Sequence, residues 1–416
     1  MSTVIQQLSL SDLSELYQVA YGGFEVDAAG WDNRQLLGSI RKNEKFNGNK
    51  LEIGQLLDYG GGQSSGGLPS SSTAYMVRPT LFAKSVYSTT VLDNQSMKAA
   101  RRAGTNLGAF EDATELSMNI LKQSFQEQIA RQFFGDGTGE LGEIASVVTN
   151  APGDYSVTIT AASFIQAHWI RNDLLNVASS TDLFLVSDIN LSTRVIRILR
   201  QNGSHVPLAG EKIYKQKSKD NEMLGLGGVC DAVAGDSLYG VTVDNYRWKP
   251  TKIDAAGSGP SIKLFRQLDQ EMRFVSRGVL PTDYIFSHTQ LRLFEDSEDA
   301  KSIIYVEPSV APEREAGSQV AAVKLNGRTV RIQWSPYCPE DRVYAINRNK
   351  ISLELRPDSV DRGEDCGGFI ENGDSIFFPL HVSGTPIDSF AMFYATYGNF
   401  FINPTFTGCI DGLATS

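Results

Sequence analysis

The sequence is poor in the residues that build metal centres, disulfide frameworks and covalent catalytic sites. Its 416 residues include only 4 cysteines and 4 histidines. They are scattered along the chain, at Cys230, Cys338, Cys366, Cys409, His168, His205, His288 and His381. There is no Cys-x-x-Cys pair and no His-Glu-x-x-His, so we expect no metal site. Because no secretory signal precedes them, the cysteines are expected to be reduced thiols.

Long apolar runs and a positive charge balance are also lacking. No stretch reaches the ~20 consecutive apolar residues of a membrane span, and the N-terminus lacks the basic and apolar parts of a signal peptide. With 38 Lys and Arg against 48 Asp and Glu, the formal net charge is −10. This balance argues against a protein whose main role is nucleic-acid binding, although a local basic patch stays an open alternative. The densest basic run, residues 212–219, is followed by Asp220 and Glu222 and is interpreted as a solvated loop.

The apolar content is sufficient for a core. Hydrophobic residues make up 41% of the chain, and the length favours two or three folding units of about 150 residues each. Helical patterns interrupt strand patterns irregularly, which predicts an α+β fold. Strands are expected at residues 155–159, 183–187, 238–243, 283–286, 329–332, 342–346 and 390–402. Helices are expected at residues 162–177 and from the end of the strand at 183–187 through Arg200.

An extended hairpin is predicted for residues 46–96. Two arms flank a low-complexity tip at residues 60–67, Gly-Gly-Gly-Gln-Ser-Ser-Gly-Gly. Ordering about 50 residues costs on the order of 50–100 kcal/mol, and a two-stranded ribbon is marginal in water. The apolar residues of the arms must therefore be buried, either against the rest of this chain or against a neighbouring copy. They are Leu51, Ile53, Leu56, Leu57, Tyr75, Val77, Leu81, Phe82, Val86 and Val91.

The strongest helical pattern covers residues 109–134. Apolar residues recur every three or four positions and mark one face, which is expected to be buried. They are Phe110, Ala113, Leu116, Ile120, Leu121, Phe125, Ile129 and Phe133. The helix is expected to stop at the glycine-rich run 135–139, where positive φ angles permit a sharp reversal.

Two enzyme motifs occur in contexts that do not support them. Residues 137–142, Gly-Thr-Gly-Glu-Leu-Gly, match the dinucleotide-binding fingerprint but follow a helix instead of a strand, which favours a turn. Residues 62–66, Gly-Gln-Ser-Ser-Gly, match the nucleophile elbow but have polar, glycine-rich flanks. The acidic pairs Glu298–Asp299 and Glu364–Asp365 are interpreted as solvated surface, and His168 as a core or interface residue. We therefore expect no catalytic, cofactor-binding or metal-binding residues, and no enzymatic activity.

The order of these parts, with three phrases of sequence, resembles the major capsid proteins of tailed phages, which have the HK97-like fold. The first phrase is the long helix ending in residues 132–139, Gln-Phe-Phe-Gly-Asp-Gly-Thr-Gly, after an extended hairpin. The second is residues 325–330, Leu-Asn-Gly-Arg-Thr-Val, followed by residues 335–344, Ser-Pro-Tyr-Cys-Pro-Glu-Asp-Arg-Val-Tyr. The third is residues 394–400, Tyr-Ala-Thr-Tyr-Gly-Asn-Phe.

The resemblance implies an α+β HK97-like capsid fold with six parts. They are an N-terminal arm (1–45), an extended β-hairpin loop with its return strand (46–106), a long spine helix (107–135), the first part of a peripheral domain (136–189), an axial domain (190–340), and the peripheral return with the C-terminal strands (341–416). Some members of the family join subunits through Lys–Asn isopeptide bonds. Lys50 or Lys84 with Asn399 or Asn403 would be the candidates here, but ordinary surface lysines and turn asparagines are favoured.

The resemblance also implies a function. It implies a structural protein of the virion that self-assembles into the pentamers and hexamers of an icosahedral shell and encloses double-stranded DNA without sequence-specific binding. Expected partners are a separate scaffolding protein, a portal and decoration proteins, with assembly in the host cytoplasm and no membrane. Two alternatives stay open. One is a bacterial nanocompartment shell of the same fold, and the other is a cytosolic hydrolase with residues 46–96 as a lid.

Overall fold

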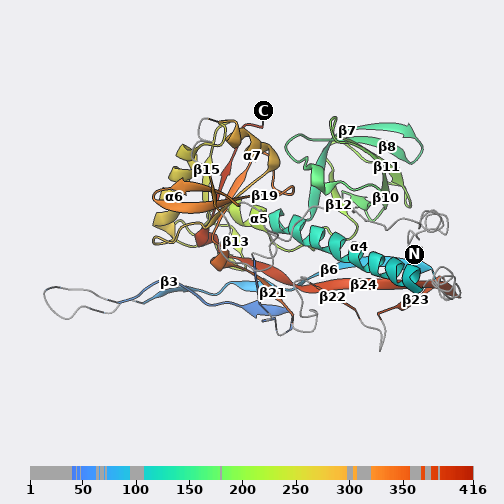
Figure 1. The fold of residues 1–416 in the computed structure, drawn as a ribbon, viewed down its shortest axis with the longest axis horizontal. Coiled ribbons are helices and arrows are strands. Elements are labelled where there is room, and N and C mark those ends of the chain that lie inside the picture. The colour runs from blue at the N-terminus through green and yellow to red at the C-terminus, as the bar shows by residue number, and fades with distance from the viewer. Residues whose placement is uncertain are drawn as a thin grey trace. The chain divides into compact units, whose positions relative to one another are not determined.

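The structure is a computed structural model (Figure 1). It describes residues 40–43, 45–46, 48–61, 65, 70, 73–93, 107–178, 180–297, 303–306, 320–356, 367–370, 376–382 and 385–415. Of the predicted N-terminal arm, all but residues 40–43 and 45 lies outside the described residues. The chain divides into two compact units. The first comprises residues 1–33, 85–130 and 355–397, and the second comprises residues 34–84, 131–354 and 398–416.

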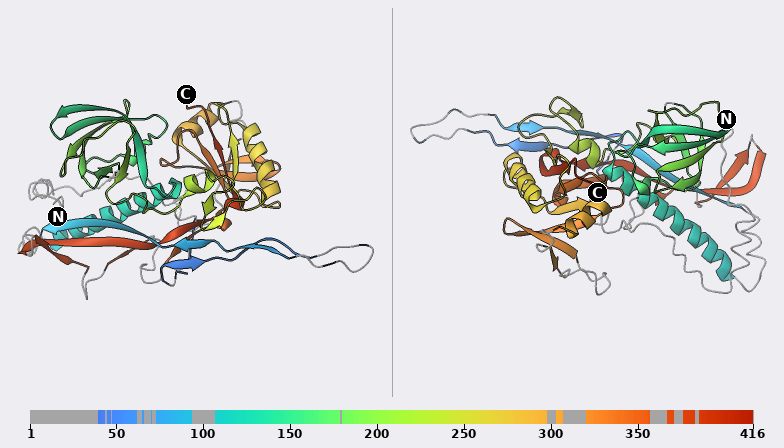
Figure 2. Two further views of the ribbon diagram at one scale, coloured as in Figure 1. Left: turned by 180° about the vertical axis from the view of Figure 1, so that it is seen from behind. Right: turned by 90° about the horizontal axis from the view of Figure 1, so that it is seen from above.

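The first unit contains most of a long helix, α4, and of a long strand, β24, both of which continue into the second unit (Figure 2). β24 pairs with β6 and runs antiparallel to β22 and β23. The rings of Phe125 and Tyr394 meet edge to face at 4.8 Å between centroids. A Cβ at Gly367 would come within 2.8 Å of both rings, so this position requires glycine. The elements are β6 (Lys84–Asp93), α4 (Leu107–Phe134), β22 (Gly368–Phe369), β23 (Phe378–Val382) and β24 (Thr385–Ile402).

The long helix predicted at residues 109–134 is confirmed, with its start two residues earlier. Leu121, Phe125 and Ile129 are buried, as the apolar pattern predicts. Ile120 was assigned to the same face, and this is wrong, because its side chain is 47% exposed. Adjacent helical positions point about 100° apart, so when Leu121 occupies the buried face Ile120 is turned toward its rim.

A closed barrel forms the first large part of the second unit. Its strand order is β10-β11-β8-β7-β12-β9, and each strand runs antiparallel to its neighbours. Val157, Phe184, Ile198 and Ile213 point into its core and have no exposed surface. The strands are β7 (Glu140–Ala151), β8 (Asp154–Ile159), β9 (Leu174–Val177), β10 (Phe184–Asn190), β11 (Val195–Arg200) and β12 (Lys212–Lys215).

The barrel corrects two expectations drawn from the sequence. The helices expected at residues 162–177 and through Arg200 are wrong: the first region holds only the 3₁₀ turn η1 (Gln166–His168) and β9, and the second holds β11. In β11, Ile196 and Ile198 are buried while Arg197 between them is exposed, which is the period of two of a strand. The domain boundary expected between residues 189 and 190 falls inside β10, so it does not coincide with a division of this barrel.

A mixed seven-stranded sheet forms the other large part of the second unit. Its order is β15-β25-β20-β16-β19-β18-β17, and Figure 1 shows the helices α6 and α7 beside it. The ring of Phe265 lies 5.7 Å from Phe286 and 5.4 Å from Phe294, which joins both helices to the central strand. The elements are β15 (Thr251–Asp254), α6 (Ile262–Val275), β16 (Asp283–Phe286), α7 (His288–Glu295), β17 (Ile303–Val306), β18 (Val320–Leu325), β19 (Arg328–Trp334), β20 (Val343–Ile346) and β25 (Thr407–Asp411).

Most strands expected outside the barrel are confirmed, with one correction. The expected strand at 238–243 is two short strands, β13 (Ser237–Leu238) and β14 (Val241–Thr242), paired antiparallel. Tyr239 and Gly240 join them with φ angles of 52° and 76°, as a tight hairpin turn requires. The turn expected after α4 is also present: Gly137 and Gly139 have φ angles of 86° and 80°, and a strand follows.

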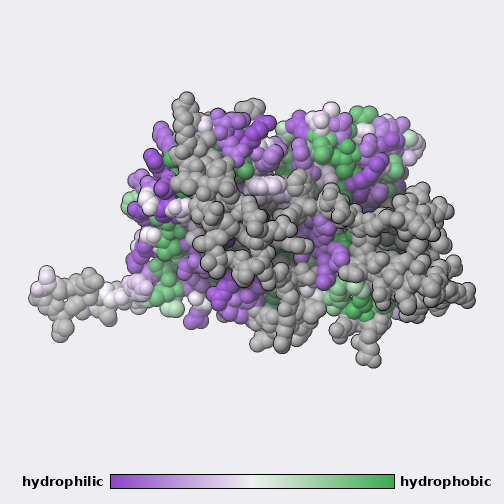
Figure 3. Space-filling view, in the orientation of Figure 1, coloured by the Kyte–Doolittle hydropathy of each residue, from purple (hydrophilic) through white to green (hydrophobic). Residues whose placement is uncertain are grey.

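Short elements complete the second unit. The strand β1 pairs in parallel with β21, and a five-residue helix, α5, precedes β13. Figure 3 shows that hydrophilic residues cover much of the coloured surface, with hydrophobic residues in smaller patches. The elements are β1 (Arg41–Asn43), α5 (Leu226–Cys230), η3 (Arg348–Lys350), β21 (Ile351–Leu355) and η5 (Pro404–Phe406).

Candidate assembly surface

The predicted extended hairpin is present in the second unit as two pairs of short strands. β2 (Lys50–Glu52) pairs with β5 (Thr80–Phe82), and β3 (Gln55–Asp58) pairs with β4 (Tyr75–Val77). Figure 1 shows β3 and its partner projecting beyond the seven-stranded sheet of the same unit. The described residues of this segment therefore form an antiparallel ribbon, as the sequence predicts.

Hydrogen bonds hold the base of the hairpin against the body of its own unit. The backbone N–H of Thr80 donates to the carbonyl oxygen of Tyr239 at 2.7 Å. The Asn399 side-chain amide donates to the carbonyl oxygen of Phe82 at 3.0 Å. The Lys84 ammonium donates to the carbonyl oxygen of Asp220 at 2.9 Å. The base of the ribbon is thus fixed without help from another copy.

Two carboxylates form a polar clasp farther along the ribbon. Asp58 of β3 accepts a hydrogen bond from the Tyr246 hydroxyl at 2.9 Å and forms an ion pair with Arg277. The Tyr75 hydroxyl of β4 donates to Asp244 at 2.6 Å. The bond from Tyr246 holds the pKa of Asp58 below its usual range, and the bond to Asp244 raises the pKa of Tyr75 to about 12. Both arms of the hairpin are therefore tied to the loop around residues 244–246, with Asp58 charged at neutral pH.

The apolar residues of the hairpin divide between a covered and an uncovered set. Val77 and Leu81 are buried within the second unit, and Val86 and Val91 are buried in the first. Leu51, Ile53 and Leu57 are half-buried. The uncovered set is Leu56, Tyr59, Tyr75, Met76 and Phe82, with 48%, 79%, 36%, 57% and 59% of their surface exposed. The sequence left open whether the hairpin is buried against its own chain or against a neighbouring copy. Its own chain buries only part of the hairpin.

Burial of the uncovered set would contribute to association with a partner. Full burial of a large apolar side chain contributes about 1.5–3 kcal/mol, and these five residues keep roughly half of their surface in water. A partner that covered them would gain on the order of 5 kcal/mol. Tyr59 and Met76 were not predicted from the sequence as part of this set. Apolar periodicity identifies side chains that face the core of their own chain, and these two do not.

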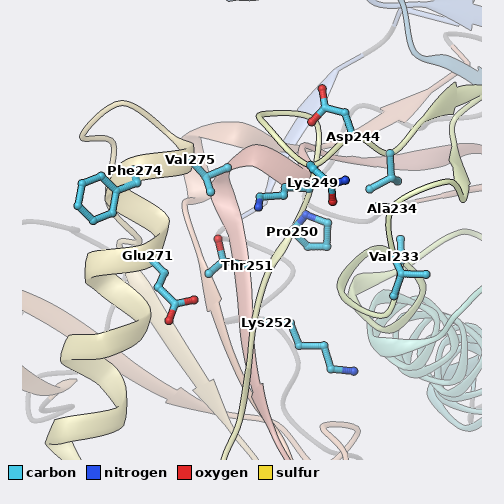
Figure 4. Close-up of a pocket in the computed structure, with 13 residues that line it drawn as sticks. Val233, Ala234, Asp244, Lys249, Pro250, Thr251, Lys252, Glu271, Phe274 and Val275 are labelled. Atoms are coloured by element: carbon cyan, nitrogen blue, oxygen red, sulfur yellow. The ribbon is translucent and has the colours of Figure 1, made fainter.

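An open pocket of about 440 Å³ lies beside the clasp (Figure 4). Asp244, which holds Tyr75, is one of its lining residues. Val233 and Phe274 line it as well and are 62% and 74% exposed. The hydroxyl of Thr251 on its wall is buried and has no hydrogen-bond partner among the described residues. Val233 and Phe274 thus add exposed apolar surface to the same unit, beside the residue that holds Tyr75.

The four residues considered for isopeptide bonds each have a different partner. Lys50 pairs with Glu52 at 2.6 Å on the surface, and Lys84 is the residue that binds the carbonyl oxygen of Asp220. Asn399 and Asn403 are 6% and 2% exposed. Asn403 accepts from the backbone N–H of Thr405 at 3.1 Å and caps η5. These contacts hold the fold in place.

The remaining candidate residues have structural surroundings. His168 is 9% exposed, and burial lowers its pKa to about 3, so it is a neutral core residue as expected. Cys230, Cys338 and Cys409 are buried free thiols, whereas Cys366 and both acidic pairs lie outside the described residues. Within the described ranges no three His, Cys, Asp or Glu side chains gather as metal ligands. No helix in those ranges has the length and apolarity to cross a membrane.

Comparisons with known proteins support the fold. No family model and no curated protein sequence matches the chain. The SrpI encapsulin of Synechococcus elongatus superposes with a TM-score of 0.50 at 7% identity, covering 98% of both chains. The capsid protein of cyanophage A-1(L) gives 0.48 at 10% identity over 92% of this chain and 93% of that one. The capsid of the native GTA particle gives 0.48 at 9% identity over 96% of each chain.

The superposition with the encapsulin over nearly the whole of both chains identifies the architecture. The chain has the HK97-like fold of shell-forming proteins, which confirms the resemblance found in the sequence. At this level of identity the likeness concerns the fold alone.

Proposed function

We propose that this chain is a shell subunit that self-assembles into closed particles. The observation that carries the proposal is the uncovered apolar set of the hairpin. The ribbon that bears this set is fixed to its own unit at the base and at the clasp. Exposed large apolar side chains gathered on one segment often mark a surface that a partner covers. A second copy that covers this surface completes the burial that the single chain leaves unfinished.

We propose that the hairpin of one copy lies over the next copy, with the helix α4 as the spine of the subunit. In this arrangement residues 1–45 form an arm across neighbours, and the seven-stranded sheet with its helices forms the part that gathers around the axes of pentamers and hexamers. A symmetric shell repeats each contact in every copy, so modest contacts sum to a stable particle. The subunit needs no catalytic residue or cofactor for this role.

We propose that the enclosed material is double-stranded DNA and that the particle is a phage virion built in the host cytoplasm. A separate scaffolding protein, a portal and decoration proteins are the partners that such a particle uses. The acidic balance supports this, because a net charge of −10 per copy leaves a packed duplex mobile.

A nanocompartment shell is the second candidate, and it is favoured by the TM-score of 0.50 with an encapsulin. The two candidates differ in their contents. Purified particles with a 260 nm absorbance excess and nuclease-resistant DNA support the virion, whereas particles that hold a co-purifying enzyme support the nanocompartment. A hydrolase with the hairpin as a lid predicts a small oligomer instead.

The test of shell assembly is sedimentation velocity and negative-stain electron microscopy of the expressed chain, alone and with its neighbouring genes. Closed particles of uniform diameter are the expected result. A monodisperse monomer or dimer in every condition contradicts the proposal, and it leaves the hydrolase alternative to be tested by gel filtration and activity screening.

A further inference from the structure

Two adjoining pockets in the second unit gather positive charge on this acidic chain. One has about 400 Å³ and is lined by Arg328, Arg331 and Arg348. The other has about 190 Å³ and is lined by Arg41, Lys45 and Lys350. Asn349 lines both pockets, so they form one continuous surface. We call these six cations the basic band.

Three segments that are far apart in the sequence supply the basic band. Residues 41–45 contain the strand β1, residues 328–331 begin β19, and residues 348–350 are the 3₁₀ turn η3. Pairing of β1 with β21 brings the first segment beside the third, because β21 follows η3 directly. Pairing of β16 with β19 and β20 places the second segment beside the third as well. This is the local basic patch that the composition left open.

The acidic groups of the band lie beneath it and are already engaged. Asp283 is buried and pairs with Arg348 at 2.7 Å. Glu354 is 2% exposed and accepts hydrogen bonds from Asn43 at 2.7 Å and Ser352 at 2.6 Å. A third buried carboxylate, Asp269, accepts two hydrogen bonds from Arg328 at 2.6 Å each. These carboxylates fix the arginines in place, and their burial leaves the positive charge at the surface.

Several cations of the band have no counter-charge. Arg41, Lys45, Arg331 and Lys350 are exposed. Arg41 and Arg331 have no ion pair among the described residues, and Lys350 only lies over the ring of Phe406, at 5.0 Å from its centroid. Arg348 keeps a buried guanidinium nitrogen without a hydrogen-bond partner in the same part of the chain. Guanidinium groups with free donors fit carboxylates in a two-pronged geometry.

The net charge of the whole chain indicates what this surface binds. Each copy carries −10, so identical copies repel one another at low salt. Because 6 of the 38 Lys and Arg residues lie in the band, the rest of the chain is more acidic than the net charge shows. Contact between the band of one copy and the acidic surface of the next turns this repulsion into attraction. Such a contact joins two different surfaces, as a ring of subunits requires.

We propose that the basic band receives acidic side chains of a second copy of this chain during shell assembly. This inference depends on the proposed shell function and names one of its subunit contacts. A nucleic-acid duplex fits the band less well, because only four of its cations are exposed and the surrounding surface of an acidic chain repels further phosphates.

The test compares two charge reversals of equal size. Arg41→Glu/Arg331→Glu reverses one residue in each pocket, and the control Arg171→Glu/Lys217→Glu reverses two exposed cations near the barrel strands, outside the band. Sedimentation velocity measures the concentration at which each protein assembles, from about 0.01 M to about 1 M NaCl. Over this range the Debye length falls from ~30 Å to ~3 Å.

We expect the band variant to require at least a tenfold higher concentration than wild type at low salt, with the difference disappearing at high salt. The control is expected to follow wild type. The neutral pair Arg41→Gln/Arg331→Gln is expected to show a smaller shift, and it keeps the test valid if the charge-reversed protein fails to fold. Equal assembly of wild type and both band variants at every salt concentration overturns the inference.

A second arm separates the inference from its rivals. Fluorescence anisotropy with a short labelled DNA duplex is measured on the unassembled chain. Binding that is lost in the band variant, together with unchanged assembly, assigns the band to nucleic acid and overturns the inference. A wild-type chain that forms no particle in any condition refutes the proposed function first. Particles that form with an unchanged salt dependence refute only the role of the band.

Discussion

The uncovered face of the hairpin can be tested by removing two apolar side chains that are cross-strand neighbours. Leu56 of β3 pairs with Met76 of β4, and they are 48% and 57% exposed. We expect Leu56→Thr/Met76→Thr to fold normally and to assemble poorly. Threonine keeps the strand propensity, and exposed substitutions usually change the free energy of unfolding by less than ~0.5 kcal/mol.

The size of the effect follows from the exposed fractions. Full burial of a leucine or methionine contributes about 1.5–3 kcal/mol, and these two residues still have about half of that contribution to gain. Their loss would weaken each hairpin contact by about 2 kcal/mol, which is ~30-fold in the association constant. Because a closed shell repeats the contact in every copy, the concentration required for particles rises by at least that factor.

Sedimentation velocity over a concentration series measures this threshold, and the chain offers a matched control. Leu208→Thr/Val148→Thr removes two apolar side chains of the barrel region that are each 60% exposed, and it should assemble like wild type. Leu81→Ala, at a fully buried position of the hairpin, should lower the free energy of unfolding by about 2–5 kcal/mol. Assembly of the hairpin variant at the wild-type concentration would refute the reasoning.

Three further predictions concern the clasp and the two cores. Asp58→Asn should make the hairpin more susceptible to limited proteolysis at neutral pH. Wild type should reach the same susceptibility only in acid, since the pKa of Asp58 is lowered and its contribution disappears as pH falls through the folded value. Gly367→Ala should lower the free energy of unfolding by about 1–3 kcal/mol in thermal or urea melts, because its Cβ meets Phe125 and Tyr394 at 2.8 Å. His168→Gln should flatten the loss of stability below pH 6.5, because a buried histidine with a pKa of about 3 stays neutral while the unfolded chain takes up a proton.

The local sequence pattern was sufficient to predict elements whose contacts are mostly with residues nearby in the sequence. α4 has its apolar residues three and four positions apart and its glycine stop next to it, so its bounds were nearly right. β16 is buried on both faces, with all four residues of Asp283–Phe286 buried, and a short apolar run predicts such a strand. The hairpin was predicted because its two arms directly flank a low-complexity, glycine-rich run of sequence.

The barrel shows where local pattern fails. Residues 162–177 contain apolar side chains at helical intervals, yet Leu175 and Val177 are buried on alternate positions of β9. β9 pairs with β10 and with β12, and the second of these lies more than thirty residues away. Pairing with the other strands of the barrel therefore outweighs the helical periodicity of this segment. Nothing within a short window carries that information.

The assembly surfaces were even less visible in the sequence. The clasp joins Asp58 to Tyr246 and Arg277, across 188 and 219 positions of the chain. The basic band joins residues near 41, 328 and 348, whereas the densest basic run in the sequence, residues 212–219, is not part of it. A net charge describes how much charge a chain carries, and only the fold decides where that charge is concentrated.

The clasp and the uncovered apolar set are linked by the entropy of association. A ribbon that ordered only on contact with a neighbour would lose its backbone freedom, at about 1–2 kcal/mol per residue, at the moment of assembly. Here Thr80, Asn399 and the clasp residue Asp58 order the ribbon within its own subunit. The apolar side chains are then held on an ordered ribbon, and more of their burial energy is left for association. In the proposed shell, a ribbon that is ordered before contact therefore loses less conformational entropy when it meets a second copy.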